Sequence, residues 1–144
     1  MKTNPSPKAK DKSLELLRGK GLNVTHPRRK ILAYLLDHHG PFSVEEIHQS
    51  MGEGFCDLAT VYRCLGQFEK KGLVERRYFG DDILRYEYLD HAHHHHHIIC
   101  TQCKAVTQLD DCDIAKLESM VKDRGYRDVS HTLEFFGVCA KCQP

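Results

Sequence analysis

The chain has 144 residues, of which 40% are hydrophobic and 28% are charged. This composition supports a packed core and is too mixed in charge for a disordered chain, and the length allows one ordinary domain or two small ones. No apolar run approaches the roughly 20 residues that span a bilayer, and residues 1–12 lack the apolar stretch of a signal peptide. We therefore expect a cytoplasmic protein with no membrane partner.

Cysteine and histidine are unusually frequent, with 7 Cys and 11 His. An odd number of cysteines without an export signal argues against a disulfide framework, and cysteine pairs beside clustered histidines favour metal binding. Charge is also uneven. Residues 1–30 carry nine Lys or Arg against two Asp or Glu, a net of +7, whereas residues 91–144 carry six against seven, a net of −1. This asymmetry indicates a polyanion-binding N-terminal part joined to a metal-binding C-terminal part.

Helices are expected through the first half of the chain. Residues 1–12 are rich in Pro and Lys and are expected to be mobile, and apolar residues then recur with the helical period. Thr25, Ser43 and Asp57 stand just before periodic segments and predict N-caps, and Glu46 completes a capping box with Ser43. The expected helices cover residues 13–19, 26–39, 44–51 and 58–71.

The pattern then changes to one typical of strands. Residues 73–79 and 83–88 flank a turn at residues 80–82 and predict a β-hairpin. Helices followed by a hairpin are the order of a winged helix-turn-helix, in which the fourth helix would read DNA. The alternative on pattern alone is a small helical domain with an incidental hairpin.

The C-terminal part is expected to form a βαβ-like unit, with a strand at residues 105–109, a helix at 114–122 and a strand at 131–138. About fifty residues make a small core, so we expect a structural metal or oligomerisation to stabilise this unit. The predicted fold is α+β. A winged helix-turn-helix domain with a basic extension is expected at residues 1–88, and a small α/β metal-binding dimerisation domain at residues 89–144.

Two Cys-x-x-Cys pairs are the strongest signal in the sequence. Cys100 and Cys103 form the first pair and Cys139 and Cys142 the second, with 35 residues between the pairs. Four thiolates suit one tetrahedral Zn(II), and a closed four-thiolate shell leaves no position for a substrate, so the predicted role is structural. Redox-active pairs or chance are the alternatives.

A run of histidines at residues 93–97 directly precedes the first cysteine pair, and its internal position argues against an expression tag. Because alternating strand residues face opposite sides, His95 and His97 are expected to face one side, and His94 and His96 the other. This arrangement allows two metal sites. Imidazoles combined with carboxylates suit exchangeable Fe(II), Mn(II) or Zn(II), unlike a thiolate cage. A solvated stretch that binds metal adventitiously is the alternative.

Taken in order, these segments resemble the ferric uptake regulator family. The resemblance lies in Gly-Leu-Asn-Val-Thr-His-Pro-Arg at 21–28, Leu-Ala-Thr-Val-Tyr-Arg at 58–63, Gly-Leu-Val at 72–74, the histidine run and the two cysteine pairs. It extends from about Ser13 to Cys142. The resemblance implies a dimeric bacterial transcription regulator with an N-terminal winged helix and a C-terminal dimerisation domain, which usually represses when metal is bound.

The resemblance also implies a set of regulatory ligands. His95, His97 and Glu87 match ligands of iron-type members, and the four cysteines match the structural zinc site. The remaining iron-type position falls on Pro41, with His38 and His39 nearby, of which His39 is included in the predicted site. In zinc-type members the corresponding positions are Glu75 and Asp90. Either set would complete a shell around the two histidines.

A third site is implied by His94, His96 and His131, which match ligands of an additional site in the dimerisation domain. The acidic ligand of that site falls on Ala115, which is a departure from the family pattern. The candidates to replace it are Asp111, Cys112 and Asp113.

The resemblance and the helix pattern together indicate the DNA-binding residues. Thr60, Tyr62 and Arg63 lie in the fourth expected helix, whose N-terminal half would enter the major groove. Arg63 is a candidate for a guanine edge or a phosphate, and Tyr62 for a thymine methyl or the backbone. Arg28, beside a helix start, is predicted to hold a phosphate. The family often has Lys where Asn23 stands. Packing of Tyr62 on the wing is the alternative.

The predicted function is a metal-responsive, DNA-binding repressor of the iron-sensing type that controls metal homeostasis. We expect a homodimer on a pseudo-palindromic operator in double-stranded DNA, with structural Zn(II) and a regulatory Fe(II), Zn(II) or Mn(II). A zinc-sensing regulator is the first alternative and a peroxide sensor the second, although peroxide-sensing members generally carry Asp where Glu87 stands. The motifs of the commoner zinc hydrolases and deaminases are absent, and a metal buffer would not need a winged helix. We therefore expect no enzymatic activity.

Overall fold

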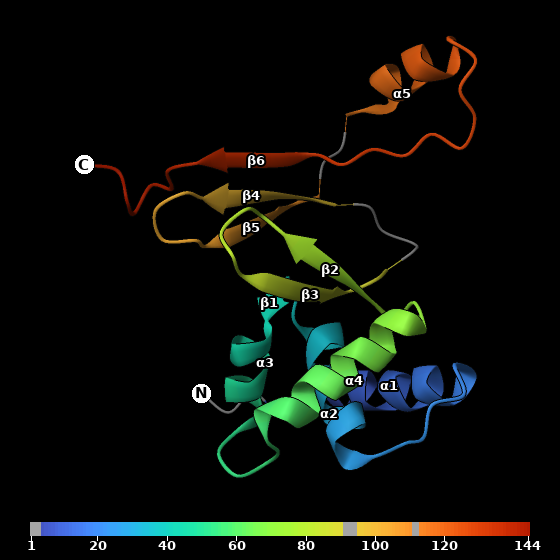
Figure 1. The fold of residues 1–144 in the computed structure, drawn as a ribbon, viewed down its shortest axis with the longest axis vertical. Coiled ribbons are helices and arrows are strands. Elements are labelled where there is room, and N and C mark those ends of the chain that lie inside the picture. The colour runs from blue at the N-terminus through green and yellow to red at the C-terminus, as the bar shows by residue number, and fades with distance from the viewer. Residues whose placement is uncertain (1–3, 91–94, 111–112) are drawn as a thin grey trace. The chain divides into compact units, whose positions relative to one another are not determined.

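The computed structural model describes residues 4–90, 95–110 and 113–144, and the chain divides into two compact units, Met1–Leu89 and Asp90–Pro144. The N-terminal unit is a group of helices with a three-stranded sheet at one end (Figure 1). Its strands are antiparallel in the order β1-β3-β2. In chain order its elements are α1 (Pro7–Gly19), α2 (His26–Asp37), β1 (Phe42–Ser43), α3 (Val44–Met51), α4 (Leu58–Lys70), β2 (Val74–Tyr78) and β3 (Leu84–Tyr88).

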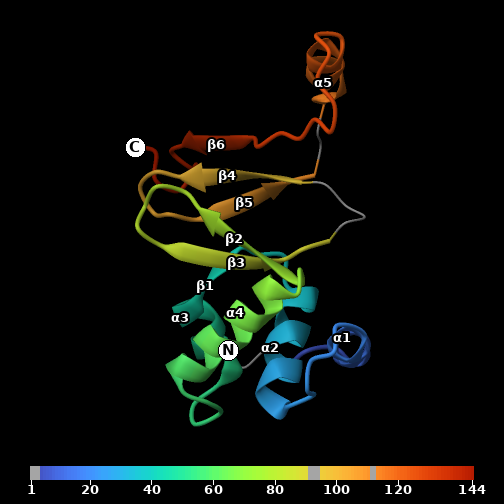
Figure 2. The same cartoon turned by 45° about the vertical axis from the view of Figure 1, so that its right-hand side comes forward.

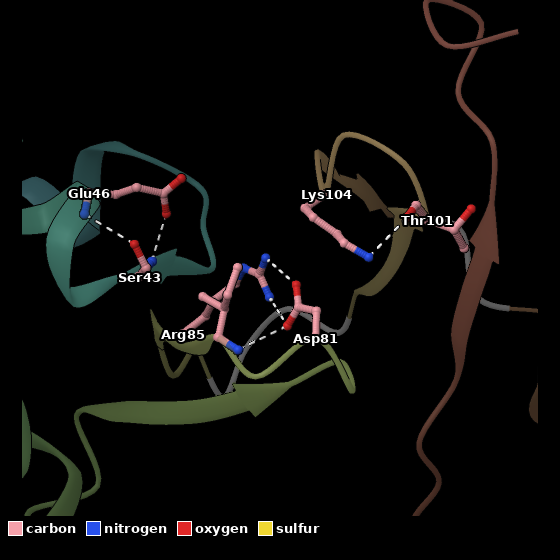
Figure 3. A network of polar contacts seen from close by, with 7 residues as sticks. Ser43, Glu46, Asp81, Arg85, Thr101 and Lys104 are labelled. Carbon is pink, nitrogen blue, oxygen red and sulfur yellow. Dashed lines mark hydrogen bonds and ion pairs between the residues drawn. The ribbon is translucent and has the colours of Figure 1, made fainter.

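The helix starts of this unit follow the predicted capping signals. The backbone N–H of Thr60 donates to the Asp57 carboxylate at 2.8 Å, and that of Arg28 donates to Thr25 Oγ1 at 3.4 Å. Ser43 and Glu46 form the reciprocal capping box at the start of α3, with bonds of 2.7 and 3.1 Å (Figure 3). Each cap satisfies backbone donors that the first helical turn leaves without a partner.

The expectation of a mobile segment at residues 1–12 was wrong for its second half, because α1 begins at Pro7. Proline is favourable in the first helical turn, where its missing N–H costs nothing. Ser6 caps the helix by accepting from the Ala9 N–H at 3.1 Å, and its hydroxyl donates to Asp37 at 2.7 Å. Ala9 and Leu17 are buried two turns apart on one face of α1. Figure 2 shows α1 nearly end-on, beside α2.

The core of the N-terminal unit collects the apolar faces of its helices and of the hairpin. The fully buried side chains include Leu17 of α1, Ile31 of α2, Ile47 of α3 and Phe68 of α4. After α4, Gly72 adopts φ +71°, which lets the chain reverse while the Leu73 N–H donates to the Phe68 carbonyl at 2.9 Å.

The turn of the hairpin is held by a charged pair. Asp81 accepts two bonds from the Arg85 guanidinium, at 3.1 and 2.7 Å, and a third from the Ile83 N–H at 3.2 Å (Figure 3). The bonds from Arg85 lower the pKa of the Asp81 carboxyl. Helices followed by this hairpin give the predicted winged helix-turn-helix order.

The C-terminal unit is a three-stranded sheet with one helix beyond its strands (Figures 1 and 2). The strand order is β5-β4-β6, with β4 antiparallel to β5 and parallel to β6. Its elements are β4 (His96–Cys100), β5 (Val106–Leu109), α5 (Ala115–Lys122) and β6 (Glu134–Gly137). The predicted α+β class is confirmed, and the last strand is shorter than the expected residues 131–138. No helix among the described residues is long and apolar enough to cross a bilayer.

Candidate metal centres and nucleic-acid interface

The four predicted zinc ligands come together in the C-terminal unit. Cys100 ends β4 and Cys139 follows β6, its parallel neighbour in the sheet, so the sheet itself brings the two pairs to one edge. All four Sγ atoms lie within 4.8 Å of one another, and those of Cys103 and Cys139 are 3.8 Å apart. Two thiolates on one tetrahedral ion with Zn–S bonds of about 2.3 Å would lie about 3.8 Å apart. The cluster therefore fits a zinc ion.

The backbone around this cluster is arranged to favour thiolate. The N–H groups of Cys139 and Cys103 donate to Cys100 Sγ at 3.4 and 3.5 Å, which lowers the pKa of Cys100 to about 6. Cys142 has the opposite tendency, because bonding among the clustered thiols, first with Cys139, raises its pKa to about 12. Four adjacent thiols cannot all ionise without a cation between them. Lys104 closes the first knuckle by donating to the Thr101 carbonyl at 2.9 Å (Figure 3).

His95 and His97 share one face at the start of β4, as predicted from strand alternation. Their rings meet edge to face with centroids 5.1 Å apart. Gln108 of β5 lies directly opposite His97 in the strand register, and its side-chain carbonyl oxygen is buried without a hydrogen-bond partner among the described residues. An amide oxygen on the strand opposite His97 is a donor of a kind that divalent cations accept. Gln108 was not predicted, because only the register of β4 against β5 brings it to the histidines.

The two candidate carboxylates of the wing are cross-strand partners, with Glu75 on β2 opposite Glu87 on β3. Arg77 binds both of them. Its Nε donates to Glu87 at 2.6 Å and its Nη2 lies 3.1 Å from Glu75. Like charges directly opposite each other in a sheet are destabilising, and the guanidinium between them offsets that repulsion. His39 is exposed beyond the end of α2, and within the described part of the N-terminal unit it belongs to no cluster of three metal-binding side chains.

The opposite face of β4 also carries an imidazole pair. His96 Nε2 lies 3.4 Å from His131 Nε2, and Glu118 Oε1 lies 2.6 Å from the other nitrogen of His131, Nδ1. Because a carboxylate accepts, Nδ1 of His131 carries a proton, and in the neutral ring this leaves the lone pair on Nε2, the nitrogen nearer to His96. Glu118 lies in α5 one helical turn after Ala115, the position where the acidic ligand was expected. Three residues predicted for this site from the sequence, His94, Asp111 and Cys112, lie outside the described residues.

Thr60, Tyr62 and Arg63, which were predicted to read DNA, lie in the N-terminal half of α4. Tyr62 is 47% exposed, and the Arg63 guanidinium donates to Thr60 Oγ1 at 3.1 Å. Arg28 of α2 donates to the Asn23 carbonyl at 2.7 Å and also to Gln67 of α4. Arg28 therefore braces α2 against α4, in addition to any phosphate it holds. Thr25, Thr60, Arg28 and Arg63 line a shared cavity of about 260 Å³ between the two helices.

Comparison with known proteins identifies the family. The model of the ferric uptake regulator family matches residues 19–136. The chain belongs to the ferric uptake regulator family. The ferric uptake regulation protein of Neisseria meningitidis serogroup A is 37% identical over 131 residues, which are 88% of this chain and 90% of that protein. The peroxide-responsive repressor PerR of Staphylococcus aureus is 32% identical over 136 residues, 92% of this chain and 90% of that protein.

A solved structure of the family agrees with the fold over the whole chain. The ferric uptake regulator of Helicobacter pylori is 25% identical, with a TM-score of 0.77, and the match covers 100% of this chain and 98% of that chain. Three functional metal binding sites are described for the Helicobacter pylori protein. The resemblance inferred from the sequence motifs is confirmed.

Replacing Cys100 with Ser should release the structural zinc and unfold the C-terminal unit, because metal binding at such a site is itself folding energy. Metal analysis of untagged protein and sedimentation analysis of the dimer measure the outcome. The matched control is Cys56→Ser, at a half-buried cysteine of the other unit, which should retain one zinc per chain. A folded, dimeric and zinc-free Cys100→Ser protein would contradict a structural role for the cluster.

Proposed function

We propose that this chain is an iron-sensing, metal-dependent repressor that binds operator DNA as a homodimer. The observation that carries the proposal is the family match over residues 19–136, with relatives named for ferric uptake regulation matched over nine-tenths of their length. The thiolate cluster and the histidine pair of β4 add the metal chemistry that such a regulator needs.

In this proposal residues 1–88 bind DNA and residues 89–144 form the dimer. The exposed Tyr62 and Arg63 of α4 are the groups that reach the bases. The C-terminal unit exposes apolar side chains on α5 and β6, including Leu117 and Met120, Phe135 and Phe136. Such patches mark interaction surfaces. The same patch on a second copy gives a twofold dimer, and a twofold dimer reads a pseudo-palindromic operator.

The regulatory metal would be held by Glu87, His95 and His97, with His39 or Glu75 completing the shell. Glu87 stands in β3 just before the boundary between the units, and the histidines stand just after it. An ion bound by both sets restrains the connecting segment and so restricts the positions open to the two reader helices. Metal then promotes DNA binding only by favouring the restrained arrangement. The factor by which metal raises the affinity for DNA must equal the factor by which DNA raises the affinity for metal. Imidazole and oxygen donors suit Fe(II).

A peroxide sensor is the second candidate, favoured by the Staphylococcus aureus repressor at 32% identity. Glu87 weighs against it, since peroxide-sensing members that the chain resembles generally carry Asp at this position. The iron-sensing proposal therefore stands first.

We also include a second exchangeable site on the opposite face of β4, at His96 and His131. Two imidazole nitrogens bound to one tetrahedral ion at about 2.0–2.1 Å would lie about 3.3–3.4 Å apart, and the two Nε2 atoms are 3.4 Å apart. Glu118 accepts a hydrogen bond from Nδ1 of His131, the ring nitrogen that would not bind the metal, as carboxylates do in carboxylate–histidine–metal arrangements. In this interpretation Glu118 positions a ligand and does not itself coordinate, which accounts for a site that functions with Ala115.

Replacing His95 or His97 with Ala should abolish metal-dependent DNA binding while leaving the dimer and its zinc intact. The measurement is the ratio of DNA affinities with and without Fe(II), titrated under anaerobic conditions. Allosteric coupling typically makes this ratio 5–150-fold, and it should fall to about 1 in these variants. His131→Ala, on the other face of β4, is the matched control and should have a smaller effect. Parallel titrations of His39→Ala and Glu75→Ala identify the remaining ligand. Metal-dependent binding that persists in both His95→Ala and His97→Ala would place the sensing ligands elsewhere.

Replacing Arg63 with Ala should weaken operator binding by about 1–3 kcal/mol if the guanidinium reads a base. Lys70→Ala, an exposed cation at the far end of α4, serves as the control for charge and should cost less. Competition with random duplex gives the specificity ratio. An equal loss on operator and random DNA would make Arg63 a phosphate contact.

Replacing Glu118 with Gln should weaken the second exchangeable site 10–100-fold, the range typical for loss of an outer carboxylate partner. Co(II) titration monitored by absorption measures this affinity, with Asp123→Asn as a control at an exposed acid after α5. The stoichiometry of the thiolate site should not change. An unchanged second affinity in Glu118→Gln, together with its loss in His131→Ala, would show that the carboxylate is not needed.

A further inference from the structure

A second cavity, of about 260 Å³, lies where the N-terminal segment meets the start of α2. Its lining consists of Asn4, Pro5, Lys10, His26, Arg29 and Lys30. Three of these side chains are permanent cations, one is an imidazole, and no carboxylate lines the cavity among the described residues. We call this space the α1–α2 cavity.

The cations of the α1–α2 cavity keep donors available for a ligand. Arg29 donates its Nε to the Lys10 carbonyl at 3.3 Å, and no other bond of its guanidinium is made within the described chain. Lys30 Nζ donates to the Met51 carbonyl at 2.7 Å and lies 4.1 Å from the centroid of the Phe55 ring. Neither these two residues nor Lys10 forms an ion pair with a described carboxylate. Asp37, the carboxylate that contacts the N-terminal segment, is bonded to Ser6.

This concentration of positive charge is unfavourable in the absence of an anion. Like charges repel one another, and the repulsion is stronger near a protein surface than in bulk water. By contrast, Arg76 at the surface of this unit is paired with Glu69, and the buried Arg85 is paired with Asp81. The first turn of α2 adds the partial positive charge of a helix N-terminus. An anion in the cavity would offset all of these contributions.

We propose that the α1–α2 cavity binds one phosphate group, and that on DNA this group is a backbone phosphodiester beside the segment read by α4. A volume of about 260 Å³ is below the roughly 300–1,000 Å³ of sites that enclose a drug-sized ligand, which favours a single tetrahedral anion. A guanidinium and two ammonium groups are the donors that phosphate recognition uses.

The position on α2 assigns the phosphate to DNA. The first turn of α2 lines both cavities of this region, with Arg28 facing α4 and Arg29 facing α1. Because Arg28 and Arg29 are adjacent in the chain, the two cavities lie on neighbouring faces of the first turn of α2. The α1–α2 cavity is therefore next to the surface that a duplex bound against α4 would contact. Asn4, Pro5 and Lys10 precede the residues that the family model matches. The contact thus combines residues of the N-terminal extension with His26, Arg29 and Lys30 of the matched part, and it rests on the proposed DNA-binding function.

The first experiment measures how operator binding depends on salt concentration, and compares the wild-type protein with its variants, each full-length and metal-loaded. The variant Lys10→Gln/Arg29→Gln is expected to bind less tightly, and the slope of log K against log salt should fall by about 0.9 per subunit for each phosphate that the variant no longer neutralises. Lys8→Gln removes a charge from the exposed side of the same helix and should leave the slope unchanged. Arg29→Lys retains the charge and should retain most of the slope. A slope unchanged in Lys10→Gln/Arg29→Gln, or an equal fall in Lys8→Gln, overturns the assignment to DNA.

The second experiment uses inorganic phosphate without DNA, followed by amide and imidazole NMR signals of His26 and Arg29. Saturable shifts in the wild type that disappear in Lys10→Gln/Arg29→Gln, with an unchanged melting temperature, support a phosphate site. Saturable shifts combined with an unchanged salt slope would mean that the site takes a free small phosphate, which overturns the DNA assignment. No saturable shift and no change in slope overturn the proposal altogether. A wild-type protein without metal-dependent DNA binding refutes the proposed function, while the phosphate titration still decides the cavity.

Discussion

The four-thiolate cluster is the constraint on which the C-terminal unit depends. Among the described residues of this unit, Ile99 and Cys100 are the buried hydrophobic side chains, which is too little apolar burial to offset an ordering cost of about 1–2 kcal/mol per residue. A structural zinc site contributes folding free energy of roughly 10–16 kcal/mol in zinc-finger peptides. Because β4 ends at Cys100, the same cluster fixes the strand that carries the histidines. In the proposed mechanism, metal sensing therefore requires the structural metal to be present first.

One short strand serves two different donor sets. His97 lies opposite Gln108 on one face of β4, whereas His96 meets His131 on the other. The first set offers imidazole and oxygen donors and the second offers two imidazoles. Such donors bind divalent metals reversibly, while the thiolate cluster selects zinc and closes around it. Since the faces share a backbone, an ion on one face restricts the strand that positions ligands on the other. The five residues of β4 therefore contribute to a thiolate site that retains its metal and to two histidine sites whose donors allow the metal to exchange.

Local signals in the sequence predicted most of the fold. Thr25, Ser43 and Asp57 cap the helices that they were expected to cap, and the cysteine pairs meet as their spacing suggested. The start of α1 was missed because a segment rich in Pro and Lys resembles a disordered tail. In the structure Pro7 occupies the first turn, and the docking of Ser6 on Asp37 joins positions 31 residues apart.

The residues that sequence reasoning missed are those whose partners are set by tertiary geometry. Glu118 reaches His131 only because α5 and the segment before β6 lie side by side, 13 residues apart in the chain. Gln108 depends on the register of β5, and the bracing of α2 on α4 by Arg28 and Gln67 spans 39 residues. No periodicity or motif encodes such pairs. The absence of an acid at Ala115 was visible in the sequence, but the contact of Glu118 with His131 was not.

In the regulatory site that we propose, Arg77 would make metal binding by the wing reversible. Its guanidinium already bonds to Glu87 and Glu75 and offsets the repulsion between these cross-strand carboxylates. A divalent cation bound to Glu87 would also offset the repulsion between the carboxylates. The net free energy of metal binding is therefore the attraction of Glu87 to the metal minus its attraction to the Arg77 guanidinium. The thiolate cluster has no such resident cation among the described side chains, and its affinity is not reduced in this way. The electrostatics of the wing therefore favour an ion that is bound when abundant and released when scarce, which is the behaviour that a sensor requires.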